Sequence, residues 1–355
     1  SLICLNKKFS EYFPTFVHIF PVKGDKLMEE MEQVIRIFPQ KLREILRTAG
    51  TEGFRAEELR LRISQPLMMR AEGRDWWLKM EKGYVWRPVE ETWERKQIYC
   101  VGEGEIRDTL EYMSRYSLYA FDEELRQGFL TIPGGHRVGV AGQAVLEGSR
   151  VKTPRNISFL NIRVAREIPG CGDQLLPWLY QERNFCSTLI ISAPGRGKTT
   201  LLRDLIRQIS DRGLKVGAVD ERSEIGACCQ GKPQNNLGLR TDLLDGCPKA
   251  EGIMMLIRSM SPQVIAVDEI GGKEDLEALR YGKNCGCSLL ATVHGNSLED
   301  IRKKPVLGEF VEEKVFSRYL VLGSRGKPGR AEGIFDGEGN LLWGKNQLGE
   351  GEGEK

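Results

Sequence analysis

Residues 190–202 read IISAPGRGKTTLL, an apolar run followed by a loop of small residues and a run typical of a helix. Small residues let backbone N–H groups turn inward, and a helix N-terminus adds positive potential, so this pattern predicts a triphosphate-binding loop. Lys198 would bridge the β- and γ-phosphates, and the hydroxyl of Thr199 would hold Mg²⁺. The residues expected to bind the nucleotide are Ser192, Ala193, Pro194, Gly195, Arg196, Gly197, Lys198, Thr199 and Thr200.

One position departs from the usual phosphate-loop pattern G-x-x-x-x-G-K-[ST]. Ser192 stands where the pattern has its first glycine. Serine is small enough to allow the turn, and Gly195 adds local conformational freedom. Taken alone, the stretch could also be a flexible loop without a ligand.

A second motif supports the ligand-binding interpretation. The apolar run 264–267, VIAV, is followed by Asp268 and Glu269. A buried strand that ends in two carboxylates is the Walker B arrangement, in which Asp268 would reach the Mg²⁺ held by Thr199. Glu269 would polarise the attacking water as general base. An Asp-Glu pair is weak evidence alone, but about seventy residues behind a phosphate loop it predicts an ATPase.

Composition limits the alternatives. The chain has 355 residues, 29% of them charged, and a formal net charge of +2. It therefore lacks the overall basic excess that would indicate a nucleic-acid-binding protein. Nine cysteines, three histidines and no C-x-x-C pair make zinc binding unexpected, and scattered free thiols suit a reducing cytosol. The sequence contains no apolar run of eighteen residues, so we expect no transmembrane helix.

The periodicity predicts two domains. Residues 28–168 are expected to form an α+β domain and residues 169–343 an α/β domain with a mainly parallel sheet. Residues 1–27 are interpreted as a non-native or disordered extension, since Met28 is the first methionine, and residues 344–355 as a disordered tail. In the first domain we predict helices within 28–48, at 57–62 and within 103–126, a hairpin of 76–80 with 84–86, and strands at 129–132, 137–145 and 159–164. In the second we predict strands at 188–192, 216–220, 264–268, 288–293, 315–322, 331–335 and 341–343, and helices at 174–180, 199–209, 250–259 and 276–281.

Further polar residues are expected at the carboxyl ends of the parallel strands, where ligands bind in such sheets. Glu221 or Glu224 would position water or metal, unless this segment is surface charge that Arg222 pairs locally. His294 would sense the γ-phosphate, or else cap its own loop. Arg258 and Arg240 are candidates for an arginine presented to a neighbouring subunit's nucleotide, although lone arginines are uninformative.

Four segments together carry a resemblance: ISAPGRGKTTLLRDLIR, VDERSEIG, GLRTDLLDGCPKAEGIMMLIRSMSPQVIAVDEIG and ATVHG. They closely resemble the stage III sporulation protein AA family, a relative of the type II and type IV secretion ATPases. The resemblance spans residues 28–343 and implies a RecA-like P-loop ATPase domain behind a smaller N-terminal domain. Lys198, Thr199, Asp268 and Glu269 match the phosphate-loop and Walker B residues. Glu221, His294 and Arg258 stand at the family's acidic box, histidine box and arginine, although both boxes are abbreviated.

The resemblance also implies a setting. A cytoplasmic ATPase of the mother cell is expected, working at the membrane facing the forespore with membrane proteins of the same channel complex. A hexameric ring that binds ATP and Mg²⁺ is implied, and nucleic acid is not expected as a partner. Two rival functions stay open: a nucleic-acid-dependent ATPase of the same fold, and a nucleotide-gated scaffold that hydrolyses little ATP.

Overall fold

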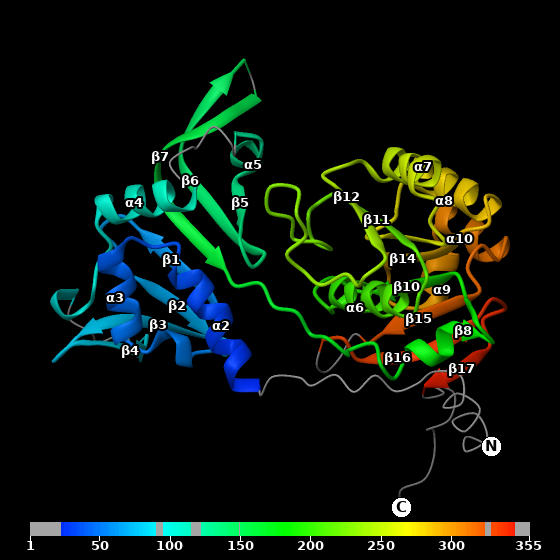
Figure 1. The fold of residues 1–355 in the computed structure, drawn as a ribbon, viewed down its shortest axis with the longest axis horizontal. Coiled ribbons are helices and arrows are strands. Elements are labelled where there is room, and N and C mark those ends of the chain that lie inside the picture. Colours follow the sequence, from blue (N-terminus) through cyan, green and yellow to red (C-terminus); the bar gives the residue numbers. More distant parts are fainter. Residues whose placement is uncertain (1–22, 90–94, 115–121, 149, 324–327, 345–355) are drawn as a thin grey trace, which may run out of the picture. The chain divides into compact units, whose positions relative to one another are not determined.

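A computed structural model describes residues 23–89, 95–114, 122–148, 150–323 and 328–344 (Figure 1). The chain divides into two compact units. Unit 1 comprises residues 1–129 and 139–164, and unit 2 comprises residues 130–138 and 165–355. The predicted domain limits at residues 168 and 169 stay a prediction. Of the predicted extension 1–27, residues 1–22 lie outside the described residues, and residues 23–27 begin helix α2 (Lys23–Ile35). Of the predicted tail 344–355, residues 345–355 lie outside the described residues, and Gly344 ends strand β17 (Leu341–Gly344).

Unit 1 is built on an antiparallel sheet. Its strand order is β4-β3-β2-β1-β7-β6-β5, and the pairings of β1 with β2 and β7, β2 with β3, and β3 with β4 are antiparallel. The strands of this sheet are β1 (Ala56–Arg62), β2 (Met68–Ala71), β3 (Arg74–Met80), β4 (Tyr84–Pro88), β5 (Phe129–Ile132), β6 (His136–Glu147) and β7 (Arg150–Arg163). Most of β5 and the first residues of β6 fall within residues 130–138, which are assigned to unit 2. The helices are α2 (Lys23–Ile35), α3 (Gln40–Thr48), α4 (Glu103–Met113) and α5 (Asp122–Gln127).

Several predictions for unit 1 are confirmed. Pro39 is the N-cap of α3 and separates it from α2, as a residue without a backbone N–H is expected to do. The β3–β4 hairpin is present. Within the predicted helix at 103–126, α4 buries Ile106, Leu110 and Met113, whereas the predicted apolar position Tyr116 lies outside the described residues.

The predicted helix at 57–62 is wrong, because this segment is strand β1. Leu59 and Leu61 are buried, whereas their neighbours Glu58, Arg60 and Arg62 are only partly buried. That two-residue alternation is the period of a strand with one covered face. The run of Glu, Leu and Arg favours a helix locally, but pairing with β2 and β7 on both sides outweighs this preference.

Unit 2 contains an eight-stranded sheet of order β12-β11-β13-β14-β10-β15-β16-β17. The six strands from β12 to β15 are parallel, and β16 and β17 continue the sheet antiparallel. The strands are β10 (Thr188–Ser192), β11 (Val216–Asp220), β12 (Thr241–Asp245), β13 (Val264–Val267), β14 (Ser288–His294), β15 (Arg318–Leu322), β16 (Ala331–Asp336) and β17 (Leu341–Gly344). The helices are α6 (Lys198–Asp211), α7 (Lys249–Met260), α8 (Lys273–Asn284), α9 (Leu298–Arg302) and α10 (Pro305–Glu312).

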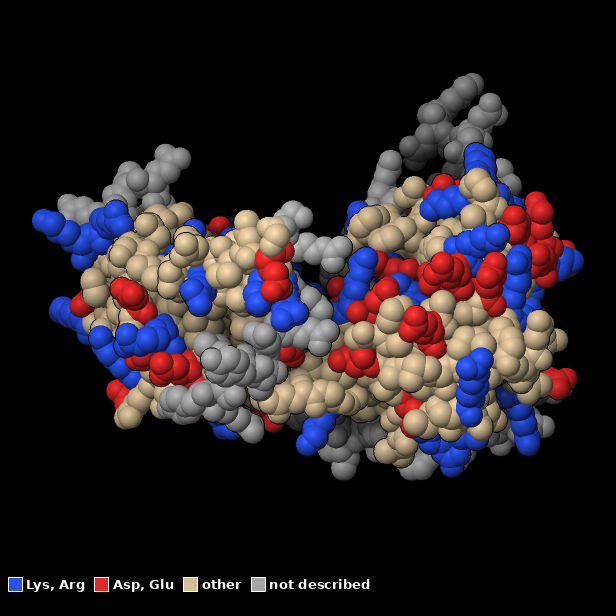
Figure 2. Space-filling model, turned by 90° about the horizontal axis from the view of Figure 1, so that it is seen from above, with Lys and Arg blue, Asp and Glu red and all other residues tan. Residues whose placement is uncertain are grey.

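The α/β fold with a mainly parallel sheet is therefore as predicted, with one helix placed wrongly. The predicted helix at 174–180 is a short 3-10 helix, Leu176–Leu179, followed by strand β8 (Tyr180–Gln181), which pairs with β9 (Asn184–Phe185). Pro177 would stand in the interior of the predicted helix, but in the observed one it stands in the first turn, where a residue without a backbone N–H is tolerated. On the face of unit 2 seen in Figure 2, Lys and Arg side chains are interspersed with Asp and Glu. None of the described helices is long and apolar enough to cross a bilayer.

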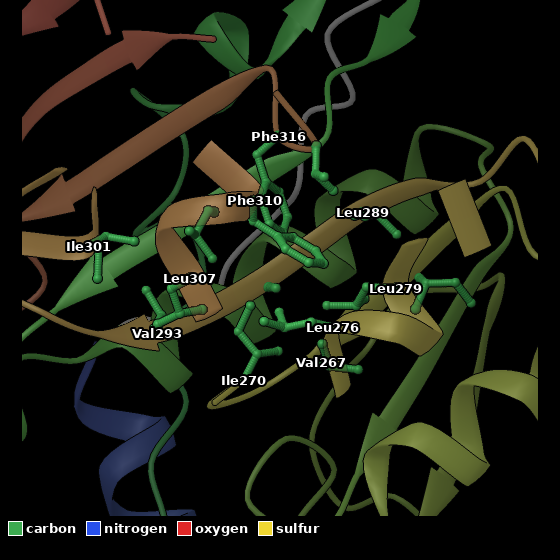
Figure 3. Close-up of a cluster of buried hydrophobic side chains, with 14 of the residues drawn as sticks. Val267, Ile270, Leu276, Leu279, Leu289, Val293, Ile301, Leu307, Phe310 and Phe316 are labelled. Carbon is green, nitrogen blue, oxygen red and sulfur yellow. The ribbon is translucent and has the colours of Figure 1, made fainter. Parts of the chain in front are cut away.

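A large apolar core holds the strands of unit 2 in place. It joins the central strands to α8, α9 and α10 (Figure 3), and its members include Val267, Ile270, Leu276, Leu279, Leu289, Val293, Ile301, Leu307, Phe310 and Phe316. Each such side chain contributes about 1.5–3 kcal/mol on burial. Because β10, β11, β13 and β14 are parallel and packed on this core, their carboxyl ends meet at one edge of the sheet.

Candidate nucleotide-binding site

The phosphate loop joins the end of β10 to the start of α6. Gly195 and Gly197 both have left-handed φ angles, 70° and 84°, which only glycine adopts without strain. A Cβ at Gly197 would lie 3.1 Å from the backbone nitrogen of Gly329, which donates to the carbonyl oxygen of Arg196 at 2.8 Å. The first N–H groups of α6 have no acceptor within the helix, so the loop and the helix start can together receive an anion.

Ser192 fits the loop in place of glycine. Its side chain is fully buried, and its hydroxyl donates to the carbonyl oxygen of Ala193 at 2.9 Å. The hydroxyl of Ser192 therefore has its hydrogen-bond acceptor in the next residue, and the serine leaves the turn intact.

Asp268 is held between two threonine hydroxyls. Thr199 of α6 donates to its Oδ2 at 2.6 Å, and Thr292 of β14 donates to its Oδ1. The predicted pair of Mg²⁺ ligands, Thr199 and Asp268, therefore lies side by side. Mg²⁺ prefers oxygen ligands and keeps waters and substrate phosphates in its shell, so two protein oxygens fit it. Among the described residues, no cluster of three or more His, Cys, Asp or Glu could hold a metal by itself.

Glu269 lies at the centre of a cluster of basic side chains. Lys198 Nζ is 2.6 Å and His294 Nε2 is 3.1 Å from its Oε1, and Arg222 donates to its Oε2 at 2.9 Å. Burial opposes ionisation of Glu269, but the hydrogen bond from Lys198 and the charges of Lys198, His294 and Arg222 outweigh it and hold the pKa of Glu269 below its usual value. The backbone of Glu269 is left-handed, with φ 55°, a strained conformation for a residue with a side chain.

His294, which the sequence predicts to sense the γ-phosphate, belongs to this cluster. Its Nε2 is 3.4 Å from Lys198 Nζ, and its carbonyl oxygen accepts a hydrogen bond from Lys304 Nζ. Its Nδ1 is buried without a hydrogen-bond partner among the described residues. The histidine is therefore held by its backbone with its ring directed at the lysine and the glutamate.

Two predicted residues are not brought into the cluster. Glu221 pairs with Lys249 of α7, so its neighbour Arg222 is the residue of this segment that contacts Glu269. Arg258 is exposed in the last turn of α7, which leads into the start of β13. It therefore lies at the amino-terminal edge of the sheet, opposite the phosphate loop, and any role toward a nucleotide would be in another subunit's site.

The segment after β11 is fixed by two residues that the sequence interpretation missed. Asp220 is buried and accepts the N–H groups of Glu224 and Gly226, each at 2.8 Å. Burial raises the pKa of Asp220 to about 6 against the opposing effect of these hydrogen bonds. Arg203 of α6 donates to the carbonyl oxygens of Ile225 at 3.0 Å and Glu224 at 2.7 Å. The loop that carries Arg222 is therefore tied to the helix that carries Lys198.

Thr292 is the third missed residue. It is fully buried in β14, donates to Asp268 and accepts the backbone N–H of Glu269 at 2.8 Å. Threonine is common in strands, so its presence in the run ATVH gives no signal of this role. Only the strand order, which places β14 between β10 and β13, would have indicated it.

The strand order and the two motifs define the class of this molecule, a P-loop α/β protein with the fold of ATPase motors. The chain belongs to the family described as sporulation stage III, protein AA, which matches residues 28–342. It is 46% identical over 277 residues to the stage III sporulation protein AA of Bacillus subtilis (strain 168), covering 75% of this chain and 90% of that protein. It is 30% identical over 161 residues to the uncharacterized protein ycf45 of Cyanidium caldarium, 44% of this chain and 46% of the relative.

A solved structure supports the fold assignment. The pilus retraction motor PilT, crystallised with bound ADP, aligns with a TM-score of 0.53 at 14% sequence identity, covering 86% of this chain and 83% of PilT. At this identity the likeness concerns the fold. The family and the fold expected from the motifs are both confirmed.

Proposed function

We propose that this protein hydrolyses ATP with bound Mg²⁺ and acts as the motor of a sporulation-specific channel complex. The observation that carries the ATPase proposal is the convergence of Lys198, Thr199, Asp268 and Glu269, since Thr199 touches Asp268 and Lys198 touches Glu269, each at 2.6 Å. These residue pairs are 69 and 71 positions apart in the sequence. Packing of the apolar core alone would not require a lysine whose side chain is only 7% exposed and whose partner is a glutamate with a strained backbone.

The chemistry follows from the position of each group. The glycine loop and the first turn of α6 would bind the triphosphate, and Lys198 would leave Glu269 to contact the β- and γ-phosphates. Thr199 and Asp268 would hold Mg²⁺, which would supply neutralisation of the phosphate charge. Freed from the lysine, Glu269 would orient the attacking water and receive its proton, and His294 would contact the γ-phosphate side of the pocket.

Phosphate release from ATP in the presence of Mg²⁺ tests this proposal. We expect turnover by the wild-type chain and none above background by Lys198→Ala, with an unchanged far-UV circular dichroism spectrum. Lys215→Ala is the matched control, because Lys215 is an exposed lysine of unit 2 that lies before β11 and outside the site. Equal turnover in wild type and Lys198→Ala would rule out this site as the origin of the activity.

The setting is proposed from the family relationship. The name of the Bacillus subtilis relative refers to stage III of sporulation, which supports a role in sporulation. The resemblance of the motifs to this family implies the mother cell as the place of that role. We propose a peripheral protein at the membrane facing the forespore, a homohexameric ring, and membrane proteins of the same complex as partners. An arginine from a neighbouring subunit, with Arg258 and Arg240 as candidates, would complete each site. Light scattering with and without nucleotide, and turnover with and without the cytosolic segment of a membrane partner, test these points.

The alternative function is a nucleic-acid-dependent ATPase of the same fold, and the turnover measurement with added partners also tests it. On the face of unit 2 seen in Figure 2, Lys and Arg side chains are interspersed with acidic ones and form no continuous basic stripe, which is a common footprint of nucleic-acid binding. Stimulation of turnover by single-stranded DNA rather than by a membrane partner would support this alternative.

A further inference from the structure

Arg222 has a place in the site that neither the motifs nor the family relationship assigns. Its guanidinium contacts Oε2 of Glu269 at 2.9 Å, while Lys198 contacts Oε1 of the same carboxylate at 2.6 Å. One carboxylate group therefore separates the arginine from the phosphate-loop lysine. This side chain is 65% exposed, so it reaches the carboxylate from the solvent side of the site.

The backbone under Arg222 is rigid, although its side chain is exposed. The next residue, Ser223, has a left-handed φ of 52°, and its hydroxyl donates to Asp245 at 2.5 Å. Asp220 and Arg203 fix the following peptide groups. A flexible side chain on a fixed backbone can exchange one acceptor for another nearby without rearranging the loop.

A triphosphate would supply that second acceptor. When Lys198 moves from Glu269 to the β- and γ-phosphates, the γ-phosphate oxygens come next to the carboxylate that Arg222 already contacts. A guanidinium has five N–H donors in a planar fork, which suits a phosphate as well as a carboxylate. It can therefore donate to the γ-phosphate and keep one hydrogen bond to Glu269.

We propose that Arg222 is a catalytic residue that contacts the γ-phosphate of the nucleotide bound to its own chain. The proposal rests on the proposed ATPase function and adds a residue to its site. Arg222 would thus distinguish a nucleoside triphosphate from a diphosphate, and it would stabilise the charge that develops on the γ-phosphate during hydrolysis.

The test compares two ligands by isothermal titration calorimetry in the presence of Mg²⁺: ADP and the non-hydrolysable analogue β,γ-imido-ATP. In Arg222→Ala, affinity for β,γ-imido-ATP should fall about tenfold or more, because a charge-assisted hydrogen bond is lost, while ADP affinity stays within about twofold. The turnover number should fall by a larger factor than the affinity. Arg222→Lys should recover part of both losses, since it keeps the charge but has fewer donors.

Arg280→Ala is the matched control. Arg280 also forms an exposed ion pair in unit 2, at 2.8 Å from Glu313, but on helices outside the site. The proposal is overturned if Arg222→Ala binds β,γ-imido-ATP as wild type does, if it loses ADP affinity equally, or if turnover falls with both affinities unchanged. Failure of the wild-type chain to bind either nucleotide would instead overturn the proposed ATPase function, and the role of Arg222 with it.

Discussion

The hydroxyl oxygen of Thr292 accepts the backbone N–H of Glu269 at 2.8 Å, across 23 positions of sequence. Glu269 has a left-handed backbone, a conformation that costs of order 1–3 kcal/mol for a residue with a side chain. The same hydroxyl donates to Oδ1 of Asp268. One buried threonine on a neighbouring strand therefore holds the backbone of Glu269 and the carboxylate of Asp268, and it leaves Oδ2 of Asp268 to face Thr199.

Thr292→Val tests this relationship, because valine keeps the shape and removes the hydroxyl. We expect the turnover number for ATP to fall about tenfold or more, since the two acids lose their fixed orientation, while KM changes little. The free energy of unfolding should fall by about 1–2 kcal/mol, because the N–H of Glu269 is left without its acceptor. Thr292→Ser is the control and should retain most of the activity. If Thr292→Val hydrolyses ATP as fast as wild type, the threonine does not position the acids.

Gly197→Ala should abolish nucleotide binding while most of the fold remains. A Cβ at this position combines a φ of 84° with an approach of 3.1 Å to the nitrogen of Gly329. The loop must therefore change shape just before Lys198. Gly213→Ala is the matched control, since Gly213 also has a positive φ, 101°, but open space around it. It should lose about 1 kcal/mol of stability and retain normal nucleotide affinity. ADP titration calorimetry measures the difference, and equal affinities in the two variants would contradict the assigned role of the loop.

His136 makes the stability of unit 2 sensitive to acid. It is buried, its Nδ1 accepts the N–H of Ala165 at 3.1 Å, and its Nε2 has no hydrogen-bond partner among the described residues. Burial lowers the pKa of His136 from 6.5 to about 4. Between these values the unfolded chain binds the proton and the folded chain does not. The free energy of unfolding should therefore fall as the pH decreases from about 6.5 to about 4, by up to about 3 kcal/mol.

Urea unfolding across that pH range checks this prediction. His136→Asn keeps an acceptor for the N–H of Ala165 and removes the titrating group, so its stability should depend less on pH. Equal pH dependence in wild type and His136→Asn would show that another group is responsible.

The sequence predicts where the phosphate loop and the acid pair lie in the fold, because each is a local pattern: a buried strand and the few residues that follow it. The sequence does not reveal which side chains from other segments contact the residues of those patterns. Thr292 and Arg222 act on Glu269 from separate segments, and their contacts depend on the order of strands in the sheet. Strand β12 was missed because it is a half-exposed neighbour of β11 without a continuous apolar run. The residue types of strand β1 favour a helix, and only its pairing with β2 and β7 on both sides decides for a strand.

The central claim is that the two motifs form one ATP-hydrolysing site, and phosphate release by Glu269→Gln tests it most directly. The substitution keeps the shape of the side chain but removes the base, so the variant should bind ATP with Mg²⁺ as tightly as wild type. Its turnover should be lower by about a hundredfold or more, the usual contribution of a general base. Turnover equal to that of wild type, with unchanged binding, would contradict the account and indicate a protein that binds nucleotide without using this site for hydrolysis.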